Sequence, residues 1–364
     1  MLLYIMCQKE MDRKSIDALK GIGILGILLV HYGLTTSNEL ISRVIASGAR
    51  GVQLMFIINA FLIFNSLSKI ELTRENIIKW WKQKFLRLIP LYWFFTIVYL
   101  VVFGTGNNYY LGTLPKISMV NILVNLLFLH GFHPYYINSI NINWFMADLA
   151  VFYVIAPFLA KKINTLEKAI IALVSVTLVG YFIEKLAMHM RIIEVQGIWA
   201  DYVHIMSFPA EFPIMLMGVL AYFVFTRIIQ GEKIHSPKTV SFLVIVISGM
   251  LAYLLIMSQG EFIVFNTIFS FGIIFFLFFI GQMIYPWKVI GNNIFAFIGK
   301  HSYGIYLSHR IFIEFLKKHS IAGDADKVYV RIIGFCIVLV LSLMISILAE
   351  QIIEKLLCKK ILKL

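Results

Sequence analysis

Long apolar runs separated by short polar segments make up most of this chain. A helix needs about 20 mainly apolar residues to cross a hydrocarbon core of about 30 Å, and runs of that order recur from one end of the sequence to the other. They predict an all-α fold, a polytopic transmembrane helical bundle of about ten spans. The predicted spans are residues 21–36, 51–67, 89–104, 144–160, 168–184, 207–227, 239–257, 262–284, 302–316 and 328–352.

The distribution of Lys and Arg predicts how these spans are oriented, because cytoplasmic loops of membrane proteins are enriched in basic residues. Residues 69–87 contain six Lys or Arg and residues 161–168 contain three, whereas residues 133–143 contain none. We therefore place the first two segments in the cytoplasm and the third outside, with two crossings between the basic segments. The apolar segment 117–132 is then an external interfacial or re-entrant segment, and both termini are cytoplasmic.

The composition supports the membrane assignment and excludes some functions. Hydrophobic residues make up 60% of the chain and charged residues 14%, whereas a soluble domain is nearer half apolar and a quarter charged. The net charge of +13 comes from Lys and Arg in the short loops, so it indicates orientation in a lipid bilayer rather than nucleic-acid binding. Three widely separated cysteines form no metal-binding motif, and no metal is expected.

The chain contains no long linker or internal repeat, and we expect residues 1–364 to form a single integral-membrane domain. A second methionine, Met11, begins a typical cytoplasmic start, MDRKS, so residues 1–10 are a candidate start-site extension. Nothing in the sequence indicates the oligomeric state.

One histidine lies deep inside the first predicted span. His31 follows Lys20 by eleven residues, which leaves about 20° of net rotation, so both side chains share a helix face, roughly 16 Å apart along the axis. An ionisable group at that depth is costly and marks a functional site. Because imidazole titrates near neutrality, His31 is a candidate general base. The alternative is a structural histidine that hydrogen-bonds a neighbouring helix.

Three glycines in the same span, Gly21, Gly23 and Gly26, match a dinucleotide-binding fingerprint by spacing alone. That fingerprint requires a preceding strand and a strand–helix turn, and here the glycines lie inside an apolar run. Glycines in membrane helices allow neighbouring backbones to approach closely. We therefore predict that these three serve helix packing.

Polar residues near the ends of other spans are further candidates. Lys84 and Arg87, one turn apart in a basic amphipathic stretch with two tryptophans, either anchor an interfacial helix or bind a phosphorylated ligand. Asp148, near Trp144 at an external span end, either forms an ion pair between helices or faces a cavity. Glu211 lies between two prolines, which predict an irregular start of the sixth span that lines a cavity.

A late stretch, SYGIYLSHR, begins the ninth predicted span. Tyr303, Tyr306 and Arg310 share one helix face by their spacing, with His309 at its edge. His309 and Arg310 would lie about nine to ten Å inside the hydrocarbon core. That depth is too great for residues that only anchor the helix at the interface.

These motifs, taken in order, resemble the membrane-bound acyltransferase-3 family, whose members O-acylate carbohydrates at bacterial envelopes. The resemblance rests on Lys20 with His31, on GVQLMFIINAFLI from Gly51 to Ile63, on Lys84-x-x-Arg87 before Ile89–Trp93, and on Gly299–His309. Lysine replaces the family's arginine at positions 20 and 84, which keeps the charge but loses bidentate phosphate recognition. Asn59 and Ala60 replace Ser-Gly, and Asp148 stands one position before the family's usual acid.

The resemblance implies an acyl-CoA-dependent acyltransferase, with acetyl-CoA as the expected co-substrate and succinyl as an alternative acyl group. The acceptor would be a hydroxyl of a carbohydrate or lipid-linked glycan, and the enzyme would lie in the bacterial cytoplasmic membrane. His31 would act as the base. Lys20, a further catalytic-site residue, would hold or steer the coenzyme's phosphates at the cytoplasmic side together with Lys84 and Arg87. We predict two binding groups: Lys84, Arg87, Tyr303, Tyr306, His309 and Arg310 for the donor, and Asp148, Trp144 and Glu211 for the acceptor.

Two other classes of protein fit the same residues. A proton-coupled secondary transporter or glycan carrier could use His31, Asp148 and Glu211 as a proton relay. Such transporters often contain inverted repeats, and the chain shows none. A structural subunit of an envelope-assembly complex would need no chemistry of its own.

Overall fold

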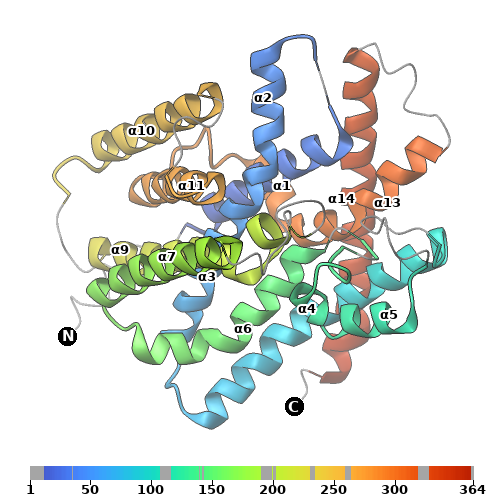
Figure 1. The fold of residues 1–364 in the computed structure, drawn as a ribbon, viewed down its shortest axis with the longest axis horizontal. Helices are drawn as coiled ribbons and strands as arrows, with labels where there is room; N and C mark the ends of the chain where they lie inside the picture. Colours follow the sequence, from blue (N-terminus) through green and yellow to red (C-terminus); the bar gives the residue numbers. More distant parts are fainter. Residues whose placement is uncertain are drawn as a thin grey trace.

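The computed structural model describes residues 12–34, 36–106, 116–138, 140–141, 143–189, 199, 202–229, 234–258, 264–318 and 328–361. Over these ranges the chain is helical and contains no strand (Figure 1), which confirms the all-α prediction. The candidate start-site extension, residues 1–10, lies outside the described residues.

The helices follow one another with short connections. Their bounds are α1 Arg13–Tyr32, α2 Glu39–Ser47, η1 Gly48–Arg50, α3 Gly51–Leu67, α4 Arg74–Phe103, α5 Met119–Leu126, η2 Leu129–Phe132, α6 Trp144–Lys162, α7 Leu166–His189, η3 Tyr202–Met206, α9 Phe208–Ile229, α10 Pro237–Met257, α11 Thr267–Ile284, α12 Asn293–Lys300, α13 Ser302–Lys318 and α14 Val328–Ile361.

Nine helical segments of the described chain are long and apolar enough to cross a membrane, and they overlap nine of the ten predicted spans. The helices Arg13–Tyr32 and Arg74–Phe103 begin before the predicted starts at residues 21 and 89. The tenth, 302–316, forms α13, which has 17 residues and is thus shorter than the roughly 20 that a span needs. Its polar positions are covered by protein, since Ser308 and His309 are fully buried and Arg310 pairs with Glu314. α13 packs along α14. Because its polar side chains contact protein rather than lipid, α13 can lie inside the bundle.

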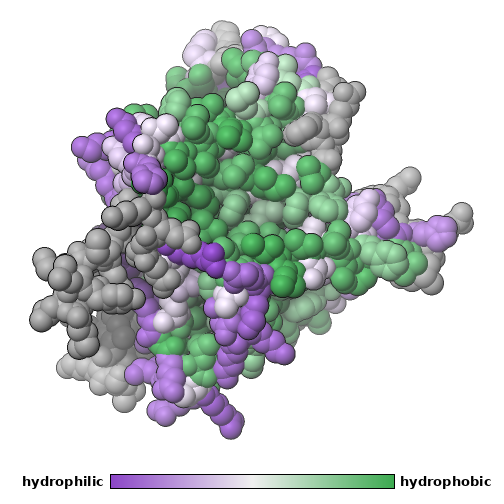
Figure 2. All heavy atoms as spheres, turned by 90° about the vertical axis from the view of Figure 1, so that its left-hand side faces the viewer, coloured by the Kyte–Doolittle hydropathy of each residue, from purple (hydrophilic) through white to green (hydrophobic). Residues whose placement is uncertain are grey.

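The surface agrees with a multi-pass membrane protein. Figure 2 shows a continuous apolar face with hydrophilic residues gathered along its edges. Large apolar side chains such as Phe182 on α7 and Met250 on α10 are exposed. In water such a face would be unfavourable, whereas in a bilayer it contacts lipid.

The segment 117–132 does not span, as predicted. It forms α5, of eight residues, followed by the short helix η2, Leu129–Phe132. Eight residues extend about 12 Å, well short of the hydrocarbon core.

The predicted orientation can be tested with single cysteines in a background without the native ones. Lys116 and Lys69 are both exposed, so neither site is hidden by the fold. A membrane-impermeant thiol reagent should label Lys116→Cys in intact cells and Lys69→Cys only after permeabilisation. The reverse pattern would overturn the predicted orientation.

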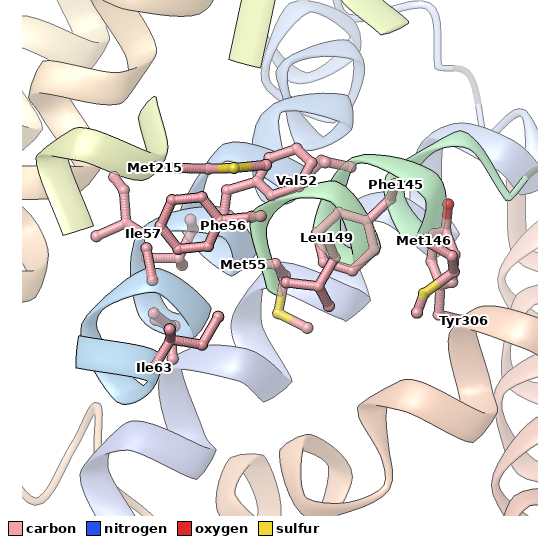
Figure 3. Close-up of a cluster of buried hydrophobic side chains, with 14 of the residues drawn as sticks. Val52, Met55, Phe56, Ile57, Ile63, Phe145, Met146, Leu149, Met215 and Tyr306 are labelled. Carbon is pink, nitrogen blue, oxygen red and sulfur yellow. The ribbon is translucent and has the colours of Figure 1, made fainter. Parts of the chain in front are cut away.

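α3 lies at the centre of the bundle, where it packs against α1, α6, α9 and α11. Its side chains are buried on nearly every side of the helix. Figure 3 shows Met55 and Phe56 of α3 beside Phe145 of α6, with Tyr306 of α13 next to Met146. The Phe56 and Phe145 ring centroids are 4.5 Å apart. This core holds α1, α6 and α13 around the site described below.

Glycines bring α1 into backbone contact with two neighbours, which confirms their predicted packing role. A Cβ on Gly21 would overlap the carbonyl oxygen of Phe295 in α12, and a Cβ on Gly299 would overlap the carbonyl oxygen of Asp17. On another side of α1, a Cβ on Gly23 would lie 3.2 Å from the carbonyl oxygen of Gly51 in α3. The glycine spacing therefore serves helix approach rather than nucleotide binding.

We predict that Gly299→Ala destabilises the protein by about 1–3 kcal/mol, because the added methyl group must push α1 and α12 apart. Gly249→Ala on α10 is the matched control, since nothing lies within 4 Å of a Cβ there and alanine favours the helix. Thermal unfolding in detergent measures both variants. Equal stability of the two would show that the α1–α12 contact tolerates a side chain.

Candidate active site

A cavity of about 420 Å³ lies between α1, α3, α4, α6 and the corner where α12 meets α13. Four cationic side chains line it, Lys20, Lys84, Arg87 and Lys300, and no acidic residue is found among the described residues of the lining. Lys20 pairs with Asp17 at 3.5 Å. Cationic groups converging on one hollow attract and bind anions, phosphates above all.

α4 carries two of these cations, and its tryptophans fix its position. Trp80 Nε1 donates to the Ser66 hydroxyl at 2.9 Å, and Trp81 Nε1 donates to the Tyr153 carbonyl at 2.8 Å. Lys84 Nζ lies 5.2 Å from the Trp80 ring centroid. Both indole N–H groups thus donate to residues of α3 and α6 rather than to lipid headgroups. This arrangement favours ligand binding by Lys84 and Arg87 over a purely interfacial anchor.

α13 closes the cavity from the opposite side. Tyr303 and Tyr306 both line it, and the Tyr303 hydroxyl donates to the Leu88 carbonyl of α4 at 2.7 Å. Farther along α1 from Lys20 the lining is apolar, with Ile24 and Ile27, and α6 adds Phe145. The cavity therefore combines cationic with apolar side chains, and along α13 its lining ends at Tyr306.

The two histidines of the predicted site lie together beyond this end. His31 Nδ1 is 2.8 Å from His309 Nε2, and the two rings are almost parallel, 9° apart, with centroids separated by 5.0 Å. His309 Nδ1 lies 2.6 Å from the Tyr306 carbonyl oxygen and 3.2 Å from that of Ile305. Tyr306, which lines the cavity, has its ring centroid 5.9 Å from that of His309.

His31 therefore does form the hydrogen bond to a neighbouring helix that a structural histidine requires. Its partner, however, is a second imidazole, fully buried in α13. Ile27 lines the cavity one turn before His31 on α1, and Tyr306 does so three residues before His309. The pair thus lies about one helical turn, some 5 Å, past the lined part of the cavity.

The structure separates the four α13 residues predicted to bind the donor. Tyr303 and Tyr306 lie in the cavity lining, whereas His309 and Arg310 do not. His309 is engaged by His31 and by carbonyls of its own helix, and Arg310 forms an ion pair with Glu314 at 2.6 Å. Donor contact by these two residues remains a prediction.

The residues predicted to bind the acceptor belong to a separate buried polar region. Trp144 packs on Phe56, with 6.0 Å between ring centroids. Asp148 is 1% exposed, and neither carboxylate oxygen has a hydrogen-bond partner among the described residues. Glu211 is fully buried and accepts a 2.6 Å hydrogen bond from Gln53 of α3. The ion pair that we considered for Asp148 is not present in the described part of the chain.

The irregular start of the sixth span is present. The π-helix η3, Tyr202–Met206, precedes α9, and Pro209 and Pro213 line a second cavity of about 410 Å³. Glu211 is not part of that lining, since its carboxylate is bonded to Gln53. The prolines therefore line a cavity as predicted, but the carboxylate between them does not.

Asparagines hold the start of α6 in place. The Asn138 side-chain oxygen accepts from the backbone N–H groups of Asn143 and Trp144 at 2.9 and 3.1 Å. Asn143 in turn donates to the Tyr92 hydroxyl at 2.7 Å. His130 lies at the Asn143 carbonyl, and burial lowers the pKa of His130 to about 4, so its ring is neutral near pH 7. This network positions Trp144 and Asp148.

Two residues near the predicted site had no role assigned from the sequence. Lys300 lies beside Gly299 in the late family motif, and its positive charge at that place was the feature of the sequence that could have indicated a role in the site. Gln53 lies in the second motif, and only the fold brings it to Glu211, 158 residues away.

Comparison with known proteins identifies the class. The chain matches the acyltransferase domain that defines the acyltransferase-3 family over residues 13–350, and it belongs to that family. Proteins of Staphylococcus aureus strains COL, MSSA476 and MRSA252 are each 25% identical to it over 353 residues. The first is named "Putative O-acetyltransferase SACOL0978", and the other two carry the same description.

The alignment covers 90% of this chain and 55% of each relative, so the chain spans about half the length of the curated relatives it matches. No solved structure gives a significant match. Family membership confirms the predicted resemblance to the acyltransferase-3 family.

Proposed function

We propose that this protein transfers an acyl group, with acetyl expected first, from cytoplasmic acyl-CoA to a carbohydrate hydroxyl of the bacterial cell envelope. The observation that carries the proposal is the arrangement of one cavity and one histidine pair. Four cations line the cavity, its lining ends along α13 at Tyr306, and His31 and His309 pair just beyond that end.

The cavity suits the anionic end of coenzyme A. Lys20, Lys84, Arg87 and Lys300 would hold the phosphates, Arg87 through its planar fork and the lysines as point charges. The apolar part beyond them, which includes Ile24 and Phe145, suits the thioester arm. A donor bound in this way would point its acyl group toward Tyr306 and the histidine pair.

His31 would be the general base of the transfer. The acceptor hydroxyl gives its proton to a ring nitrogen of His31 while its oxygen forms a bond to the acyl carbon. The bond between that carbon and the coenzyme sulfur breaks, and the thiolate leaves and takes up a proton. Proton transfer by a positioned side chain contributes about 10²–10⁴ in rate.

The acceptor would approach from the external side, near Trp144, Asp148 and Glu211. A carbohydrate offers many hydroxyl donors, and carboxylate oxygens are hydrogen-bond acceptors. Both oxygens of Asp148 and one of Glu211 lack a hydrogen-bond partner among the described residues, which supports a role in holding such a ligand. The relatives named as O-acetyltransferases support acetyl as the group and oxygen as its acceptor.

The proposal can be tested with purified protein in proteoliposomes, using acetyl-CoA labelled in the acetyl group. Carbohydrate and lipid-linked glycan isolated from bacterial envelopes serve as acceptors. We expect labelled glycan to form together with free coenzyme A, and the label to be released by mild alkali as an ester. Folded protein that transfers label to neither acceptor from acetyl-CoA or succinyl-CoA would overturn the proposal.

A further inference from the structure

We propose that His309 is a positioning residue that fixes the tautomer and the ring orientation of His31. The inference deepens the proposed function and rests on it for its catalytic meaning. It begins from the hydrogen bonds that surround the two rings, because each ring nitrogen of a neutral histidine is either a donor or an acceptor.

The proton on His309 follows from its neighbours. Its Nδ1 lies 2.6 Å from the Tyr306 carbonyl oxygen and 3.2 Å from the Ile305 carbonyl oxygen. Carbonyl oxygens only accept hydrogen bonds, so Nδ1 carries the hydrogen. A second proton, on Nε2, would make His309 a cation. The His309 side chain is fully buried and directly precedes Arg310 in the sequence, so this charge would be costly. His309 Nε2 is therefore the acceptor.

The proton on His31 follows in turn. His31 Nδ1 lies 2.8 Å from this acceptor nitrogen, so Nδ1 must be the donor. That leaves the lone pair of His31 on Nε2, the nitrogen at the far side of the ring. A neutral histidine can otherwise hold its proton on either nitrogen. The contact with His309 selects the tautomer whose Nε2 is a base.

His309 is itself held rigidly. Both carbonyls that accept from Nδ1 belong to the α13 backbone, and the side chain is fully buried. The two rings are nearly parallel, 9° apart, so a fixed His309 ring would hold the plane of the His31 ring through their contact. Catalytic triads achieve the same control with a buried carboxylate, whereas here the orienting group is uncharged and so less costly in a membrane interior.

The test uses His309→Leu, which removes the acceptor, and His309→Gln, whose side-chain oxygen can accept from His31 again. His301→Gln is the matched control, since His301 bonds Glu350 at 2.7 Å rather than His31. The protein contains nine histidines, so the ring ¹⁵N signals of His31 are assigned in labelled proteoliposomes by their absence from His31→Gln. Solid-state NMR then reports which ring nitrogen of His31 carries the proton, without any substrate.

We expect Nδ1 of His31 to be protonated in the wild type and in His301→Gln, and the proton to be shared between both nitrogens in His309→Leu. Acetyl transfer by His309→Leu should fall about ten- to a hundredfold in kcat, by analogy with the loss of a partner that orients a metal-ligating histidine. The KM for acetyl-CoA should stay nearly constant, and His309→Gln should recover most of the rate.

A wild-type His31 protonated on Nε2, or identical His31 signals in the wild type and His309→Leu, would overturn the assignment of His309. A kcat loss in His309→Leu that His309→Gln does not reverse, with the tautomer unchanged, would do the same. Failure of the proposed function is a different result: the wild type then shows the expected tautomer and transfers no acyl group.

Discussion

Replacing His31 with glutamine is expected to reduce acyl transfer about a hundred- to ten-thousandfold, because the base that takes the hydroxyl proton is lost. The glutamine amide can still donate to His309 Nε2, which lies 2.8 Å from the native ring. The variant should therefore fold and keep the α1–α13 contact. Initial rates with labelled acetyl-CoA in proteoliposomes, normalised to folded protein, measure the effect.

His301→Gln is again the control for this experiment, since it replaces a buried histidine of the same region without touching His31. Its rate should stay close to that of the wild type. A His31→Gln enzyme that turns over at nearly the wild-type rate would remove His31 from the mechanism and leave it as a packing residue between α1 and α13.

Replacing Arg87 with glutamine is expected to raise the KM for acyl-CoA about ten- to 150-fold, with little change in kcat. A hydrogen bond to a charged group contributes about 1.5–3 kcal/mol, which corresponds to that range in affinity. Arg87 lines the cationic cavity, whereas the histidine pair lies beyond its opposite end. The interaction should be lost equally from the ground state and the transition state, which changes KM rather than kcat.

Arg74→Gln is the matched control, because Arg74 is exposed on the same helix and is not part of the cavity lining. Steady-state kinetics in detergent on both variants separate ligand binding from membrane anchoring. An unchanged KM for Arg87→Gln together with a lower yield of folded protein would identify Arg87 as an interfacial anchor instead.

Local helical geometry explains why the first half of the site could be predicted from the sequence. Lys20 and His31 share one helix, so their spacing fixes their relative position, and α1 is continuous from Arg13 to Tyr32. Lys84 and Arg87 are likewise one turn apart on α4, and both reach the cavity. The spans were predictable for the same reason, since length and hydropathy are properties of each segment.

Contacts between distant segments set the limit of that prediction. His309 lies 278 residues from His31, and its own spacing pattern grouped it with the tyrosines that are predicted to bind the donor. The sequence shows which residues of α13 are charged, but it does not show that neighbouring helices bury them. Gln53 and Glu211 show the same limit, because neither residue has a local pattern that names the other as its partner.

The glycine contacts of α1 have a consequence for how an acyl group could reach His31. α1 meets α12 at Gly21 and Gly299, and α3 at Gly23 and Gly51, with no room for a methyl group at the first contact. A helix held at backbone distance on two sides cannot slide or tilt without breaking close packing. Passage from the cavity to the histidine pair therefore depends on rotation of side chains at Ile27 and Tyr306, which line the end of the cavity. We therefore expect the side chains of Ile27 and Tyr306, rather than the helices around them, to move when an acyl group passes.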